Sequence, residues 1–166
     1  MKKLLTLGCL ILGIAFLTNS NTYAQDIKAG GGLAYGTEIE SIGIQAGAVM
    51  GFSDSFRGAA DFIYFFGEEA NGVDTSWWEL NANVHYVFLS EATMTVYGLG
   101  GLNYATVETT VSAGGFTASG SASEVGLNLG GGAEFGIGFA DLYTELKYVL
   151  GDADQLGISA GLRFGF

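Results

Sequence analysis

The stretch LGISAGLRFGF, residues 156–166, shows most clearly the pattern that decides the fold. Every second residue in it is apolar, and these residues are Leu156, Ile158, Ala160, Leu162, Phe164 and Phe166. Glycine, Ser159 and Arg163 stand between them. Because successive side chains of a β-strand point to opposite faces, the alternation predicts a strand with one apolar face and one face of glycine and a cation.

The composition of the whole chain agrees with a protein built of such strands. Of its 166 residues, 49% are hydrophobic and only 14% are charged, about half the usual share in soluble domains. The chain has no proline, a residue that cannot donate a hydrogen bond to a strand ladder. The length predicts a single domain.

Residues 1–24 have the pattern of a secretory signal peptide. A cationic head of two lysines precedes an apolar core at 4–17, which is shorter than the roughly 20 residues that a membrane-spanning helix needs. The small-x-small cleavage site Thr22-Tyr23-Ala24 follows. We therefore expect residues 1–24 to be removed and 25–166 to form the folded domain.

Cleavage at this point changes the cysteine count and the charge of the chain. It removes Cys9, the only cysteine, so we expect no disulfide. It also leaves four Lys and Arg residues against 17 Asp and Glu residues, a formal charge of −13. A chain this negative is a poor partner for nucleic acid.

From residue 26 onward the alternation recurs between polar or glycine-rich breaks, and it predicts eight strands. They are expected at 26–36, 40–52, 56–66, 76–89, 94–108, 122–137, 140–150 and 156–166. Each is long enough for a tilted membrane strand of about 9–11 residues. Short breaks alternate with mostly longer ones, the short at 53–55, 90–93 and Gly138 and the long at 67–75, 109–121 and 151–155, although the first break, around 37–39, is short too. The pattern predicts an all-β fold, an eight-stranded antiparallel transmembrane β-barrel with a short-turn periplasmic rim and longer extracellular loops.

Two segments of the predicted barrel are less regular. The glycine-rich stretch 98–101 leaves the phase of the fifth strand ambiguous, and it accommodates a bulge or a phase shift. The tract at 109–123 is rich in Ser, Gly, Thr and Ala, and we expect most of it to be a flexible hairpin loop.

The charged side chains of the predicted strands gather on one face. We predict that they form a charge network in the barrel lumen, made of Lys28, Arg57, Asp61, Glu79, His85, Glu134, Glu145, Lys147 and Arg163. The opposite face is apolar and is expected to carry lipid-facing aromatic girdles near the strand ends: Phe52, Phe56, Tyr64, Trp78, Phe88, Tyr148 and Phe166. A soluble ligand-binding barrel would place the apolar face inside. The mixture of paired charges with glycine favours the charged face inside, because eight strands enclose little room.

The final strand, with its alternating apolar residues and Phe166 at its end, resembles the C-terminal signal of bacterial outer-membrane proteins. With the signal peptide and the eight strands, the whole of 25–166 resembles the small OmpA/OmpX-like outer-membrane barrels, a group that includes porin-like eight-stranded barrels. The resemblance implies location in the outer membrane of a Gram-negative bacterium and contact with outer-membrane lipid and lipopolysaccharide. It also implies assembly by the machinery that reads the C-terminal strand. It implies no catalytic motif.

Three functions are compatible with such a barrel. A filled lumen predicts a non-enzymatic protein with a structural or surface-interaction role, since buried charges are costly unless they are paired. Alternatively, the same charged residues would line a small porin-like channel. The most distant hypothesis is a lipid-modifying enzyme built around His85 with Asp61 or Glu79. We assign no catalytic residue, and an extracellular partner stays open.

No metal and no cofactor are expected. His85 is the only histidine, the chain after residue 24 has no cysteine, and zinc sites are built mainly from these two residue types. Asp152 and Asp154 stand in an acidic loop that lacks the rest of a twelve-residue calcium loop. We predict that this loop is part of a solvated acidic rim.

Overall fold

The computed structural model describes residues 27–67, 69–70, 73–113, 116–152 and 154–166. The signal peptide predicted at 1–24 lies outside them. The strands are β1 Ile27–Gly36, β2 Ser41–Gly51, β3 Phe56–Phe65, β4 Glu69–Ala70, β5 Val73–Ser90, β6 Met94–Ala113, β7 Phe116–Gly136, β8 Asp141–Leu150 and β9 Gln155–Gly165. No helix in the described part of the chain is long and apolar enough to cross a membrane.

The strands form a closed ring. Each long strand pairs antiparallel with the next long strand along the chain, and β1 pairs with β9 to close the sheet. The two-residue strand β4 pairs with β5 alone among the described strands, and β3 pairs directly with β5. The prediction of an eight-stranded antiparallel barrel is confirmed. Closure pairs both edges of each strand within the wall, so the backbone groups there are satisfied.

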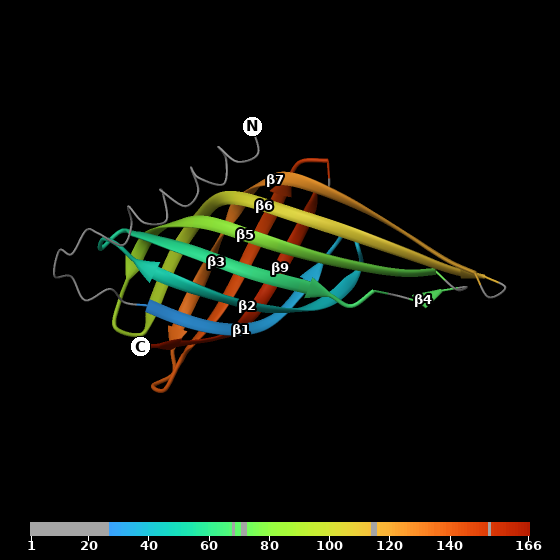
Figure 1. The fold of residues 1–166 in the computed structure, drawn as a ribbon. Helices are drawn as coiled ribbons and strands as arrows, with labels where there is room; N and C mark the ends of the chain where they lie inside the picture. Colours follow the sequence, from blue (N-terminus) through green and yellow to red (C-terminus); the bar gives the residue numbers. More distant parts are fainter. Residues whose placement is uncertain (1–26, 68, 71–72, 114–115, 153) are drawn as a thin grey trace.

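The two ends of the barrel differ (Figure 1). One end, which we call the short-turn end, holds the connections at 52–55, 91–93 and 137–140 together with Phe166. Gly138 in the last of these connections has a φ of 96°, a conformation that favours glycine. The opposite end, which we call the loop end, holds the long hairpin of β6 and β7.

The prediction of a loop at 109–121 is wrong, because the described part of this tract forms strand. β6 continues to Ala113 and β7 begins at Phe116, and the two are paired from this point down to the short-turn end. Adjacent strands of a hairpin satisfy each other's backbone groups, so the small side chains of the tract do not prevent strand formation. β5 likewise begins at Val73, ahead of the predicted residue 76.

The phase of β6 is regular where the sequence left it ambiguous. Tyr97, Leu99, Asn103 and Ala105 are all buried, so the odd-numbered residues of this segment point into the barrel. The irregularity lies in the neighbouring strand β5, where the register shifts between residues 87 and 89 and Phe88 is the extra residue.

The lumen near the loop end is filled by an apolar cluster, which we call the apolar plug. It contains Ala34, Ile63, Phe65, Trp77 and Ala105, with Ile39 and Val107 packed against them. The run at 62–66 is apolar in both phases, so alternation does not reveal that two of its side chains face inward. The lumen is therefore apolar near the loop end and polar below it, whereas the sequence predicted a lumen of charges and glycine.

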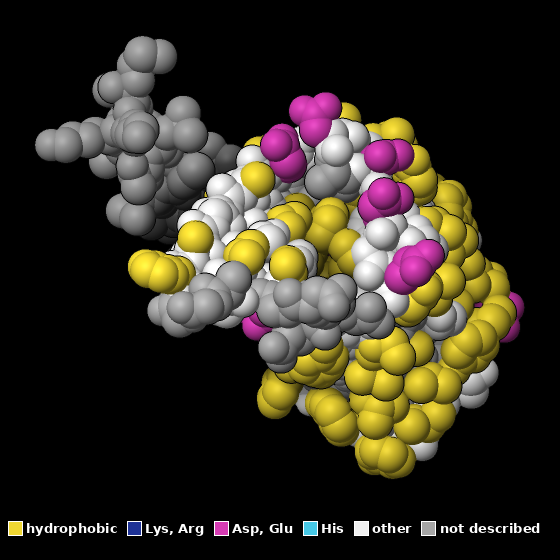
Figure 2. Space-filling view, turned by 90° about the vertical axis from the view of Figure 1, so that its right-hand side faces the viewer, with side chains coloured by type: hydrophobic (Ala, Val, Ile, Leu, Met, Phe, Trp, Pro, Cys, Tyr) yellow, Lys and Arg dark blue, Asp and Glu magenta, His cyan; other side chains and the backbone are white. Residues whose placement is uncertain are grey.

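The outer wall of the barrel is apolar. Large hydrophobic side chains are exposed on each wall strand, for example Leu33 at 60%, Leu129 at 58% and Ile42 at 56%. Figure 2, which looks onto the loop end, shows apolar side chains over the visible part of the wall. Soluble monomers rarely expose continuous apolar patches larger than a few hundred Å². A wall of this composition requires apolar surroundings.

Candidate functional site

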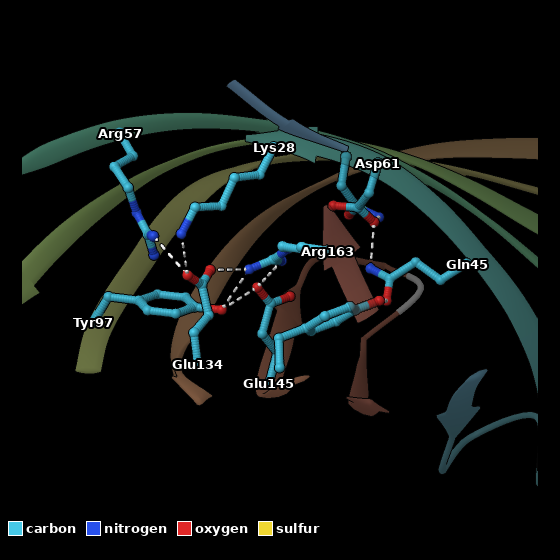
Figure 3. A network of polar contacts seen from close by, with 10 residues as sticks. Lys28, Gln45, Arg57, Asp61, Tyr97, Glu134, Glu145 and Arg163 are labelled. Atoms are coloured by element: carbon cyan, nitrogen blue, oxygen red, sulfur yellow. Dashed lines mark hydrogen bonds and ion pairs between the residues drawn. The ribbon is translucent and has the colours of Figure 1, made fainter. Parts of the chain in front are cut away.

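A polar network fills the lumen between the apolar plug and the short-turn end (Figure 3). At its centre the carboxylate of Glu134 on β7 meets three cations. Arg163 Nη1 lies 2.5 Å and Arg57 Nη1 lies 3.0 Å from its two oxygens, and Lys28 Nζ lies 3.6 Å away. The three cations come from β9, β3 and β1, so the cluster joins four strands of the ring.

Arg163 also links Glu134 to a second carboxylate. Its Nη2 lies 2.7 Å from Glu145 Oε1, and its Nη1 donates to the Tyr97 hydroxyl at 3.1 Å. The Tyr97 hydroxyl donates to Glu145 Oε1 at 2.6 Å, and the Arg163 guanidinium lies 4.1 Å from the centre of the Tyr143 ring. Because a buried charge is costly unless it is paired and hydrogen-bonded, the geometry favours a structural role for these groups.

A second layer of the network lies nearer the apolar plug. Lys147 Nζ approaches Glu79 Oε2 at 3.3 Å and donates to Asn81 Oδ1 at 2.8 Å. Asn103 donates to the same two side chains at 3.0 and 2.9 Å, and Gln155 donates to the other oxygen of Glu79. One lysine and one glutamate are thus held together by three amide side chains.

Asp61 joins the second layer to the first. Its Oδ1 accepts hydrogen bonds from Gln45 and Asn81, each at 3.0 Å. Gln45 in turn accepts a hydrogen bond from the Tyr143 hydroxyl at 2.9 Å, and Tyr143 is the ring that Arg163 covers.

Glycines on the inner face make room for these large side chains. A Cβ atom at Gly30 would overlap the Leu162 carbonyl oxygen of the adjacent strand. At Gly132 it would lie 2.7 Å from the Tyr97 hydroxyl and 2.8 Å from Glu145 Cγ. Any side chain at either position would displace the neighbouring strand or the network itself.

His85 is buried in the lumen. Its ring stacks on Tyr97 with the ring centres 4.4 Å apart, and its Nδ1 has no hydrogen-bond partner among the described residues. Asp61 and Glu79 form their hydrogen bonds with amides and with Lys147 instead. Among the described residues, no group of three or more His, Cys, Asp or Glu side chains could hold a metal ion.

The space inside the barrel is unevenly distributed. A vestibule of about 330 Å³ opens at the short-turn end and is bordered by Lys28, Arg57, Glu134 and Asp141. Lys28 Nζ lies 2.8 Å from Asp141 at this vestibule. Two cavities further inside, one beside Tyr143 and one beside Lys147, hold about 10 Å³ each, at the lower limit of what a water molecule needs.

Sequence reasoning missed two aromatic members of the network, Tyr97 and Tyr143. Tyr97 precedes the glycine run whose phase was ambiguous, so no signal marked it as inward. Tyr143 stands two residues before Glu145 and four before Lys147, and period two would have placed all three on the same face.

The aromatic residues predicted for the girdles lie on the outer wall or at its rims. Phe52, Phe56, Phe88 and Phe166 are exposed towards the short-turn end, and Tyr64 and Tyr148 are exposed towards the loop end. Trp78 is half-buried and packs against Phe62 and Tyr104, with ring centres 6.0 and 5.7 Å apart.

Carboxylates surround the barrel opening at the loop end. Figure 2 shows acidic side chains along this rim and no Lys or Arg on the visible face. The exposed acidic residues of this end are Glu38, Glu40, Asp74, Glu108, Glu124, Asp152 and Asp154. All four Lys and Arg residues of the described chain lie in the lumen.

The fold is similar to those of solved outer-membrane barrels. Ail, the attachment invasion locus protein of Yersinia pestis, is 19% identical over 84% of this chain and 97% of its own, with a TM-score of 0.59. Neisserial surface protein A is 18% identical over 86% of this chain and 96% of its own, with a TM-score of 0.57. A major outer membrane protein of Thermus thermophilus is 13% identical over 86% of this chain and 100% of its own, with a TM-score of 0.64.

These similarities define the class of fold, which is that of the small outer-membrane β-barrels. Ail has also been solved in complex with the heparin analogue sucrose octasulfate, and in a phospholipid bilayer nanodisc. No protein-family model matches the chain, and no curated protein matches it in sequence.

Proposed function

We propose that the protein is a non-enzymatic β-barrel of a bacterial outer membrane with a structural and surface-interaction role. The observation that carries the proposal is the pairing of an apolar outer wall with a lumen packed by charge pairs. This distribution is the inverse of a soluble barrel, in which the apolar side chains fill the inside.

The outer wall supports location in a lipid bilayer. Burial of apolar surface contributes about 25 cal/mol per Å², so a wall of exposed Leu, Ile, Val and Phe favours lipid over water. The aromatic residues at both ends of the wall fit the two membrane interfaces. The proposal includes export through a signal peptide at 1–24, contact with outer-membrane lipid and lipopolysaccharide, and recognition of β9 by the assembly machinery.

The lumen supports a closed barrel rather than a porin-like channel. An ion crossing it would have to break the layers around Arg163 and Lys147 and then pass the apolar plug. Buried pairs resist such separation, since removing one partner costs about 3–5 kcal/mol. The vestibule at the short-turn end gives access to the first layer only.

The enzyme hypothesis has the least support. The Nδ1 atom of His85 has no hydrogen-bond partner among the described residues, and the ring stacks on Tyr97 inside the lumen instead of lying at a rim. We therefore propose no catalytic residue.

Refolding into detergent micelles and phospholipid vesicles tests the proposal. We expect a strand-rich circular dichroism spectrum, a shift in gel mobility on boiling, and no stable ion conductance across planar bilayers. A protein that stays soluble and folded in plain buffer would refute the membrane location. Steady single-channel currents would refute the closed lumen and favour the channel.

A further inference from the structure

The hairpin of β6 and β7 carries a free strand edge at the loop end. β8 pairs with β7 only from Leu127 onward, where Leu150 is the partner. Gly151 lies beside Val125 and Gly126, so residues 116–124 of β7 have β6 on one side and no paired strand on the other among the described residues. At about 3.3 Å per residue, this edge is about 26 Å long. Unpaired N–H and C=O groups along such an edge are ready to pair with another chain.

One face of this protruding hairpin forms a shallow groove. The groove has a volume of about 520 Å³ and is lined by Val107, Thr109 and Val111 of β6 and by residues 118–122 of β7. A Cβ atom at Gly120 would meet no atom within 4 Å, so the β7 side of the groove is open. Small side chains beside a free edge leave space for the side chains of an added strand.

The charge of the hairpin is of one sign. Asp74, Glu108 and Glu124 are exposed on β5, β6 and β7, and no Lys or Arg lies on these strands in the described residues. Glu124 stands on the same face of β7 as the groove residues Ala118 and Ala122, because even-numbered residues share a face. Rim carboxylates on other loops add to the negative field (Figure 2).

We propose that the free edge of β7 at 116–124 binds an extended, cationic polypeptide segment as an additional β-strand. Main-chain hydrogen bonds to the edge hold the segment, and its alternate side chains enter the groove. Lys or Arg at these positions reaches Glu124, while Glu108 and Asp74 steer the approach of the segment. The inference rests on the proposed function, since it requires a barrel inserted in a membrane with this hairpin outside the bilayer.

The test uses the full barrel folded in nanodiscs of zwitterionic lipid, after its heat-dependent gel shift has been recorded. The probe is an end-blocked nine-residue peptide of alternating lysine and valine, and fluorescence anisotropy measures its Kd. One control peptide replaces lysine by glutamate. A second control carries N-methyl groups on alternate residues, which removes the hydrogen-bond donors of one edge. We expect both controls to bind at least tenfold more weakly.

Two matched double variants test the role of charge. Glu108→Gln/Glu124→Gln removes the carboxylate on the groove face of β7 together with an exposed carboxylate on the opposite face of β6, and Asp54→Asn/Glu91→Gln removes two exposed carboxylates at the short-turn end. An exposed ion pair with Glu124 contributes about a two- to threefold change in affinity and Glu108 adds only long-range attraction, so we expect about a threefold loss in the first variant. The second variant should change Kd by less than twofold.

Amide hydrogen exchange locates the bound peptide. We expect the peptide to slow exchange at residues 116–124 and not on the barrel wall. Equal binding of the N-methylated or glutamate peptide, or of sucrose octasulfate in place of the lysine peptide, would overturn the inference. Protection of 116–124 that rises with protein concentration alone would assign the edge to a second copy and also overturn the inference. A barrel that inserts but binds no peptide contradicts this inference only, whereas a barrel that fails to insert contradicts the proposed function.

Discussion

Arg163→Ala removes the cation that two buried carboxylates share. Glu134 keeps Arg57 and Lys28, whereas Glu145 keeps the Tyr97 hydroxyl as its hydrogen-bond partner among the described residues. Loss of one partner of a buried ion pair leaves an uncompensated charge and costs about 3–5 kcal/mol. We expect the free energy of unfolding to fall by about this amount.

Urea unfolding in phospholipid vesicles measures this loss. Tryptophan fluorescence follows the transition, because Trp77 lies in the apolar plug and Trp78 on the wall, and the chain has two tryptophans. The double variant Arg163→Met/Glu145→Gln removes the isolated charge together with its partner and keeps side-chain volume in the lumen. It should recover most of the stability that Arg163→Ala loses.

Two results would refute this reasoning. A loss below about 1 kcal/mol in Arg163→Ala would mean that the pair is solvated or that its desolvation cost cancels its attraction. A double variant as unstable as Arg163→Ala would attribute the loss to packing against the Tyr143 ring. Glu91→Gln, an exposed change at the short-turn end, should stay within about 0.5 kcal/mol of the parent in the same assay.

Three further variants probe the wall, the strand contacts and the histidine. Leu129→Arg places a charge on the exposed wall and should lower the free energy of unfolding in vesicles by about 2–4 kcal/mol. An unchanged unfolding midpoint would argue against a lipid-facing position. Gly30→Ala forces β1 away from the Leu162 carbonyl and should cost about 1–3 kcal/mol, whereas Gly165→Ala meets no atom within 4 Å and should cost less than about 0.5 kcal/mol. His85→Phe keeps the stack on Tyr97 and removes a nitrogen that has no hydrogen-bond partner among the described residues. The free energy of unfolding should therefore change by less than about 1 kcal/mol. A larger loss would mean that the histidine makes a further stabilising contact.

The alternation of apolar residues with polar residues or glycine determined how many strands the barrel has and which residues of most strands face inward. The reason is local, because the direction of a side chain in a strand depends only on its parity. Where the sequence does not alternate clearly, the prediction of inward residues or of strand bounds failed. In the run at 62–66 both phases are apolar, and Phe65 points into the apolar plug. In the tract at 109–121 the small residues suggested a loop, yet hairpin pairing makes it strand.

Only the tertiary structure decided which inward residues meet. Glu134 contacts Lys28, Arg57 and Arg163 from three different strands, and parity says nothing about their heights in the barrel. Those heights follow from the tilt and stagger of strands in a closed ring, which are properties of the whole sheet. The free edge of β7 arises in the same way, since it depends on where β8 ends relative to β7. Whether a residue faces inward or outward is therefore decided within each strand, whereas contacts across the lumen exist only once the ring has closed.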